Sequence, residues 1–195
     1  MAIKISGNWK KGFALDLHTT KSEYAGVDQY GHDRFNNTRS EIGELVYLLK
    51  YKNDEDAVSK IVCKIKEAIN GIDKFDYIIP IPPSNQSRNK QPVFLVAKAL
   101  SNEFHVPVLI DALRKCKPTG QVKNEKDKDK SKRLELLRGS IQLTPEIDLT
   151  GKMILLIDDL FDTGSTLTVA TEVLYTAGHA KAVCVLTLTK TRSNR

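Results

Sequence analysis

Apolar residues along the chain form short runs that predict strands alternating with helices. Uninterrupted runs predict strands buried on both faces at residues 75–83, 106–110 and 154–157. Partly alternating runs predict further strands at residues 9–18 and 182–189. Apolar residues spaced three or four apart predict helices at residues 42–49, 58–69, 92–100 and 167–174. Such alternation implies a parallel sheet, so we expect the α/β fold class, with a central parallel sheet flanked by helices.

The N-terminal part of the chain has weaker patterns. Residues 24–37 are interpreted as a loop because glycine and asparagine interrupt them and no apolar period is present. Thr38, followed three residues later by Glu41, fits a capping box and would begin the first helix. The second helix should begin near Asp54 and stop at Gly71.

Two adjacent acids, Asp158 and Asp159, directly follow the apolar run at residues 154–157. We call them the acid pair. Open α/β sheets bind ligands at the carboxyl ends of their strands, which is where this pair is expected to lie. Two neighbouring carboxylates repel each other, so the pair predicts cationic or hydroxyl partners: ribose hydroxyls, a lysine or a hydrated Mg²⁺.

A loop rich in hydroxyl groups comes next, made of Asp162, Thr163, Gly164, Ser165 and Thr166. We call it the 162–166 loop. It precedes a predicted helix, and its glycine permits a close backbone approach, so its N–H groups are suited to a phosphate. Ser165 or Thr166 is expected to cap the helix. The alternative is a strand, a turn and a capped helix with no ligand.

The whole string from the apolar run to this loop closely resembles the phosphoribosyl-diphosphate (PRPP) signature of type I phosphoribosyltransferases. Further segments resemble the ComF-like branch of that family: the proline-ended strand at residues 77–82, the helix at residues 95–100, and residues 114–121 and 137–141. The four-cysteine zinc ribbon of that branch has no counterpart here. The resemblance implies a single domain over residues 1–195, with a small hood at residues 1–50 and an α/β core at residues 51–195 that includes a flexible loop at residues 114–133.

The resemblance also implies a function, in which PRPP with Mg²⁺ donates ribose 5-phosphate to a nitrogenous acceptor, such as a nucleobase, and pyrophosphate leaves. The 162–166 loop would hold the 5′-phosphate, and the acid pair would hold the ribose hydroxyls. Asp162 is a candidate base, with an anchor of the loop as its other interpretation. The pyrophosphate side would be formed by Ser84, Arg88, Arg114 and Lys115. Mg²⁺ would be held mainly by PRPP, with no direct protein ligand expected.

Two other functions stay open: a regulatory protein that binds PRPP or a nucleotide without turnover, and a ComF-like accessory protein in DNA uptake. The net charge of +6 suits either a polyanionic small ligand or nucleic acid. The lysine-rich residues 122–133 are interpreted as a solvated loop; interspersed acids and the lack of aromatic residues argue against single-stranded DNA as a partner.

A homodimer is a further expectation. Three scattered cysteines and the lack of a long apolar segment predict a cytoplasmic protein with no membrane contact.

Overall fold

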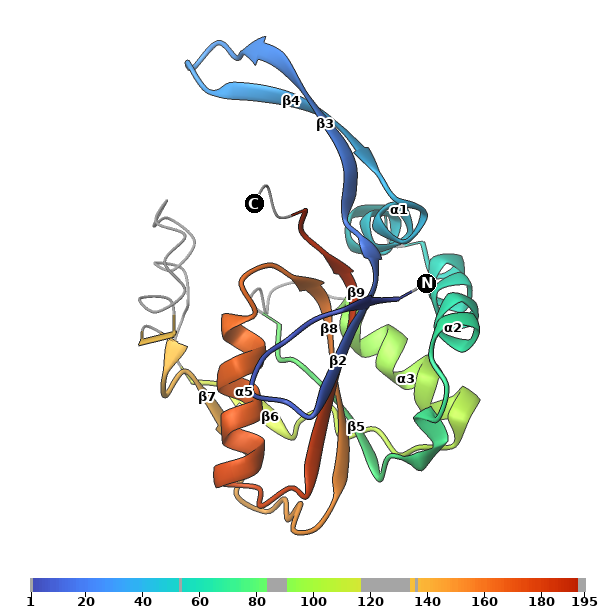
Figure 1. Ribbon diagram of the computed structural model, residues 1–195, viewed down its shortest axis with the longest axis vertical. Helices are drawn as coiled ribbons and strands as arrows, with labels where there is room; N and C mark the ends of the chain where they lie inside the picture. The colour runs from blue at the N-terminus through green and yellow to red at the C-terminus, as the bar shows by residue number, and fades with distance from the viewer. Residues whose placement is uncertain (1, 53, 84–90, 117–133, 136, 193–195) are drawn as a thin grey trace.

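The computed structural model describes residues 2–52, 54–83, 91–116, 134–135 and 137–192. Its centre is a five-stranded sheet with the order β1-β2-β9-β8-β5 (Figure 1). The four parallel strands are β2 (Lys11–Leu17), β9 (Ala182–Lys190), β8 (Met153–Phe161) and β5 (Tyr77–Pro80), and β1 (Ile3–Lys4) lies antiparallel at the edge. The predicted α/β class with a central parallel sheet is confirmed.

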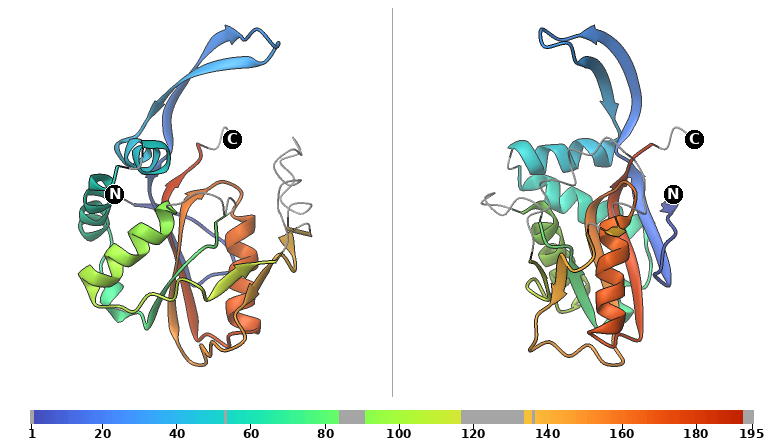
Figure 2. Two further views of the ribbon diagram at one scale, coloured as in Figure 1. Left: turned by 180° about the vertical axis from the view of Figure 1, so that it is seen from behind. Right: turned by 90° about the vertical axis from the view of Figure 1, so that its left-hand side faces the viewer.

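Helices cover both faces of the sheet, as the two views in Figure 2 show. One face packs against α1 (Glu41–Tyr47), α2 (Asp56–Ala68) and α3 (Pro92–Phe104), and the other against α5 (Ser165–Thr176). Successive residues of β8 enter opposite cores, because neighbouring side chains of a strand point to opposite faces. Leu155 and Ile157 pack with the first set of helices, and Ile154 and Leu156 pack with α5.

Several predicted elements are confirmed with small shifts at their ends. The helices near residues 58–69, 92–100 and 167–174 correspond to α2, α3 and α5. The predicted strand at residues 106–110 is wrong: it joins the sheet only through an isolated parallel bridge between Ile78 and Val108. Pro107 has no N–H to extend the ladder, although its carbonyl accepts from Ile78 at 2.9 Å.

The predicted loop at residues 24–37 is also wrong, because this segment belongs to an antiparallel ribbon of β3 (Thr19–Val27) and β4 (Asp33–Arg39). Figure 1 shows the ribbon, in blue, extending well beyond the rest of the molecule. Most of its side chains are exposed on both faces, which removes the alternation that would have identified strands. Its turn is closed by Asp28, whose side chain accepts from the backbone N–H groups of Tyr30 and His32 at 2.8 and 2.9 Å.

The first helix is capped by Ser40 rather than by Thr38. The Ser40 hydroxyl accepts from the N–H of Gly43 at 3.0 Å and donates to the carbonyl of Leu17 at 2.5 Å, which ties α1 to the end of β2. The helix continues through a π-helical turn, η1 (Leu48–Lys52), and α2 begins at Asp56.

The boundary expected at residue 50, between a hood and the α/β core, does not coincide with the edge of the central sheet. Strands β1 and β2 come from the segment expected to form the hood, yet β2 pairs with β9 in the central sheet. The expected flexible loop at residues 114–133 also needs correction at its start. Arg114 and Lys115 belong to β6 (Leu113–Lys115), which pairs antiparallel with β7 (Ile141–Leu143). Residues 117–133 lie outside the described part of the chain.

Candidate functional site

The acid pair lies within the last part of β8, not beyond it, because the strand continues to Phe161. The two carboxyl groups therefore point to opposite faces of the sheet. Asp158 stands beside Thr187 of β9 and faces the side covered by α5, where it lines a small hollow with the 162–166 loop. Asp159 faces the side covered by α1, and its backbone N–H donates to the Asp158 carboxyl at 2.8 Å.

Lys50 is the partner of Asp159. Its Nζ lies 2.6 Å from Oδ2 of Asp159, and the two side chains are only 28% and 20% exposed. The lysine comes from η1, and such π-helical turns are frequent at functional sites. A lysine was one of the three partners that the acid pair predicted, and the structure supplies it from 109 residues away.

His18 belongs to the same neighbourhood through Thr189. The Thr189 hydroxyl donates to the backbone carbonyl of Asp159 at 3.0 Å, and Nδ1 of His18 lies 3.2 Å from that hydroxyl. Burial lowers the pKa of His18, with further lowering by Arg39 and Lys50, while Asp159 opposes the shift. The imidazole is therefore held towards its neutral form beside the acid pair.

Asp158 has the most perturbed titration of the site. Desolvation first, and the negative charge of Asp159 second, raise the pKa of the Asp158 carboxyl to about 8. The N–H of Asp159 and the charges of Lys115 and Lys50 oppose this shift. Near neutral pH one carboxyl of the pair is therefore mostly protonated and the other is paired with an ammonium group. The first is able to donate a hydrogen bond and the second to accept one.

The hollow beside Asp158 has the dimensions of a small ion. Its volume is about 70 Å³, and it is lined by the whole 162–166 loop together with Leu137, Asp158, Leu160 and Leu167. Water occupies about 30 Å³ per molecule, so the described walls leave space for a tetrahedral oxyanion. The hollow lies at the N-terminus of α5, where free N–H groups and the helix dipole favour negative charge.

Gly164 determines the shape of this loop. Its φ is 76°, in the left-handed region, and a Cβ atom there would lie 2.7 Å from Cε2 of Phe161. Gly164 itself is the N-cap of α5 and no side chain caps the helix, so the expected cap by Ser165 or Thr166 is wrong. The hydroxyl of Thr163 instead lies 2.9 Å from that of Ser165, within the loop.

Asp162 is exposed and accepts a hydrogen bond from the Thr191 hydroxyl at 3.2 Å. The backbone N–H of Thr191 also donates to the carbonyl of Phe161 at 2.8 Å. The start of the loop is thus tied to the segment that follows β9. This contact is compatible with an anchor of the loop, and the exposed carboxylate of Asp162 is accessible from solvent.

The residues expected on the pyrophosphate side are only partly described. Lys115 lies close enough to Asp158 to lower the pKa of that carboxyl, while Arg114 is exposed on the neighbouring position of β6. Ser84 and Arg88 lie outside the described residues. Within the described ranges, no three His, Cys, Asp or Glu side chains gather as a metal-ligand set.

Sequence patterns missed Lys50 and His18 as neighbours of the acid pair. The available signal was chemical, because two adjacent buried carboxylates need a cation, and Lys50 lies on a helix whose apolar stripe faces the same side of the sheet.

Comparison with known families shows the family of the chain. A family model described as the phosphoribosyl transferase domain matches residues 93–195, more than half of the chain. The chain belongs to the phosphoribosyltransferase family. The matched region contains α3, the acid pair, the 162–166 loop and α5, whereas Lys50 and His18 precede it.

Within this phosphoribosyltransferase family, the ComF-like resemblance is also confirmed. The chain is 28% identical over 150 residues to competence protein ComFC of Bacillus subtilis (strain 168), an alignment that covers 74% of this chain. It spans 58% of the length of that relative.

Solved structures with similar folds include an adenine phosphoribosyltransferase from Thermoanaerobacter pseudethanolicus, with 15% identity and a TM-score of 0.47 over 87% of this chain and 94% of that one. An orotate phosphoribosyltransferase from Aeropyrum pernix has 15% identity and a TM-score of 0.47 over 84% of this chain and 72% of that one.

Among the described residues, no helix has both the length and the apolar character needed to cross a bilayer.

Proposed function

We propose that this protein is a phosphoribosyltransferase that uses PRPP with Mg²⁺ as donor, transfers ribose 5-phosphate to a nitrogenous acceptor and releases pyrophosphate. One observation carries the proposal. The phosphate-sized hollow of the 162–166 loop is lined by Asp158, so an anion site and a carboxyl group adjoin at the end of one strand. A phosphorylated sugar presents a phosphate and vicinal hydroxyls, which the hollow and the carboxyl group would bind.

The 162–166 loop would hold the 5′-phosphate through its backbone N–H groups and hydroxyls. Asp158 and Asp159 would hold the ribose hydroxyls, one from each side of the strand. As pyrophosphate departs, positive charge develops on the ribose ring, and the ionised carboxylate of Asp159 would stabilise it electrostatically. Lys115, near Asp158, would face the departing pyrophosphate together with Arg114, Ser84 and Arg88.

Mg²⁺ would be carried by the diphosphate of PRPP and would neutralise charge on the leaving group. The protein's own contribution would then be to bind and orient the sugar phosphate.

Free thiols in all three cysteines fit a reducing compartment, and we propose that the protein is located in the cytoplasm.

Asp162 has two proposed roles that a single variant separates. If Asp162 acts as the base towards an acceptor nitrogen, Asp162→Asn should abolish turnover while PRPP–Mg²⁺ affinity stays within about threefold. If it serves only to anchor the loop through Thr191, Thr191→Val should reproduce the whole effect of Asp162→Asn on both turnover and affinity.

Calorimetric titration with PRPP and MgCl₂ tests the binding proposal. We expect saturable binding in the wild-type protein and a loss of about 10- to 100-fold in the variant Asp158→Asn with Asp159→Asn, since the one charge-assisted hydrogen bond lost, that of Asp159, is worth about 1.5–3 kcal/mol. The variant Asp33→Asn with Asp73→Asn changes the same net charge at exposed positions away from the site and should bind as the wild type does. Equal affinity in all three proteins would show that the site is wrongly assigned.

Turnover is a separate question from binding. Pyrophosphate release, measured over a panel of nucleobases, should be abolished by the Asp158, Asp159 double variant. Binding of PRPP without release for any acceptor would favour the second candidate, a regulatory protein that senses PRPP.

A role as an accessory protein in DNA uptake is favoured by one observation, the similarity to competence protein ComFC. Single-stranded DNA binding with an affinity that falls steeply between 50 and 200 mM salt would support this role. An absence of salt-sensitive binding would exclude it.

A further inference from the structure

A second cavity lies at the amino ends of the central strands, away from the acid pair. Its volume is about 560 Å³, within the range of about 300–1,000 Å³ typical of small-molecule sites. The cavity reaches Leu155 of β8, four residues before Asp159 on the same face of the sheet. At about 3.3 Å per residue, that separation is about 13 Å. The cavity and the phosphate-sized hollow share no lining residue.

The floor of this cavity is an apolar part of the sheet at the margin of the first core. Phe13, Leu155 and Leu186, from three adjacent strands, form it, and Leu155 and Leu186 also pack in that core. Helix α2 ends at Ala68, and Gly71, with a φ of 81°, follows it in the wall of the cavity.

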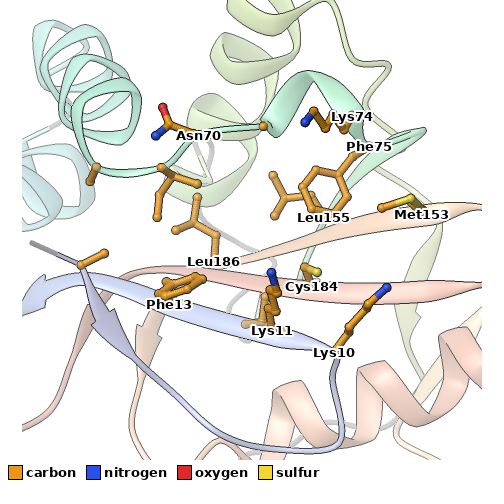
Figure 3. Close-up of a pocket in the computed structure, with 15 residues that line it drawn as sticks. Lys10, Lys11, Phe13, Asn70, Lys74, Phe75, Met153, Leu155, Cys184 and Leu186 are labelled. Carbon is orange, nitrogen blue, oxygen red and sulfur yellow. The ribbon is translucent and has the colours of Figure 1, made fainter.

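Aromatic rings enclose the cavity from two sides. Figure 3 shows Phe13 on the strand side and Phe75 on the opposite wall, with Leu155 near Phe75 and Leu186 above Phe13. Two phenyl rings and branched aliphatic side chains form a surface suited to a flat apolar group.

The rim of the cavity is positively charged. Lys10, Lys11 and Lys74 line it, and in Figure 3 the ammonium groups of Lys11 and Lys74 lie on opposite walls. All three side chains are exposed, none forms an ion pair with a described residue, and no described acid lines the cavity. Burial raises the pKa of the Cys184 thiol, which lines the cavity, and the positive charges of Lys10 and Lys11 act in the opposite direction. The carboxyl end of α2, whose last residue Ala68 lines the cavity, works against an anion, so the three ammonium groups must outweigh this dipole.

We propose that this cavity is a binding site for an amphipathic anion, with an aromatic body between Phe13 and Phe75 and a carboxylate, sulfonate or phosphate head at the lysines. Burial of the flat body would supply most of the affinity, and the three ammonium groups would select a negative head over a neutral one. The site is separate from the proposed PRPP site and does not depend on the proposed reaction.

Fluorescence titration with 8-anilinonaphthalene-1-sulfonate tests this proposal directly. We expect saturable binding with increased emission, and displacement by 2-naphthoate at least about tenfold more effective than by the neutral analogue 2-naphthalenemethanol. The variant Lys11→Glu with Lys74→Glu should weaken binding by about tenfold or more. The matched variant Lys60→Glu with Lys98→Glu reverses the same charge on exposed helical positions outside the cavity and should bind as the wild type does.

The proposal would be overturned by equal displacement by the neutral analogue, by wild-type affinity in the Lys11, Lys74 variant, or by better displacement by dodecanoate than by 2-naphthoate. Displacement of the dye by PRPP–Mg²⁺ would also overturn it, because it would place the dye in the acid-pair site. Dye binding that persists in the Asp158→Asn, Asp159→Asn variant supports the second site whatever the fate of PRPP binding.

Discussion

Replacing Lys50 with methionine removes the ammonium group that pairs with Asp159 and keeps the length of the side chain. The carboxylate of Asp159, which is 20% exposed, would then lack its partner at 2.6 Å. Hydrogen bonds to charged groups contribute about 1.5–3 kcal/mol, whereas exposed ion pairs contribute about 0.2–1 kcal/mol. Since this pair is mostly buried, we expect Lys50→Met to lower the free energy of unfolding by about 2 kcal/mol.

Urea unfolding of Lys50→Met and of a matched variant measures this effect. Lys66 pairs with Glu103, and the two side chains are 50% and 39% exposed, so Lys66→Met should cost less than about 1 kcal/mol. With a denaturant slope near 2 kcal/mol/M, the midpoint of Lys50→Met should fall by about 1 M and that of Lys66→Met by less than half as much. A double-mutant cycle with Asp159→Asn should recover most of the Lys50 effect as a coupling energy.

A second readout separates electrostatics from packing. Lys50 lowers the pKa of His18, so the pKa of His18, followed by NMR, should rise in Lys50→Met and stay unchanged in Lys66→Met. Equal midpoints for the two methionine variants, with no change in the titration of His18, would refute the reasoning.

Three further predictions concern the same end of the sheet. The folded pKa of Asp158, about 8, lies above its unfolded value near 4, so the stability that its protonated form contributes is lost as the pH rises between these two values. Asp158→Asn should reduce this loss, measured by urea unfolding at pH 5 and pH 8, and an unchanged pH dependence would contradict the raised pKa. Gly164→Ala should destabilise the protein by more than about 1 kcal/mol and weaken phosphate binding, because Gly164 has a positive φ and a Cβ there would meet Phe161. Thermal unfolding measures the loss of stability, and an unchanged unfolding temperature would show that the loop can relax. Ser40→Ala should cost about 1 kcal/mol in the same assay through the lost cap of α1, while Thr38→Ala, at the cap position expected from the sequence, should have no effect.

The unit from β8 to α5 could be predicted closely from the sequence, because an unbroken apolar run, two acids and a glycine each have one dominant interpretation. The opposite orientation of the two acids could not, since it depends on the strand extending to Phe161. That extension comes from pairing with β9 as far as Lys190, a long-range contact that no local pattern encodes.

The remaining misses have two physical causes. The acid pair predicted a cationic partner, but its identity could not be predicted locally, because Lys50 and Asp159 are 109 positions apart. The β3–β4 ribbon was missed because hydrophobic periodicity reports burial on one face, and this ribbon buries neither. What the sequence predicted well was therefore the set of elements that contribute side chains to the two cores.

The exposed ribbon has a consequence for the energetics of the whole chain. Tyr24 and Phe35 pack edge to face across its strands, with ring centroids 5.7 Å apart, yet they are 61% and 51% exposed. A lone two-stranded hairpin is at best marginally stable in water, so the free energy that closes the ribbon is small. It should open and reclose as its own cooperative unit many times for each global unfolding event. Its amide hydrogens should accordingly exchange with solvent long before those of β8 and β9, and a protease should cut near Gly31 while the sheet and both cores stay folded.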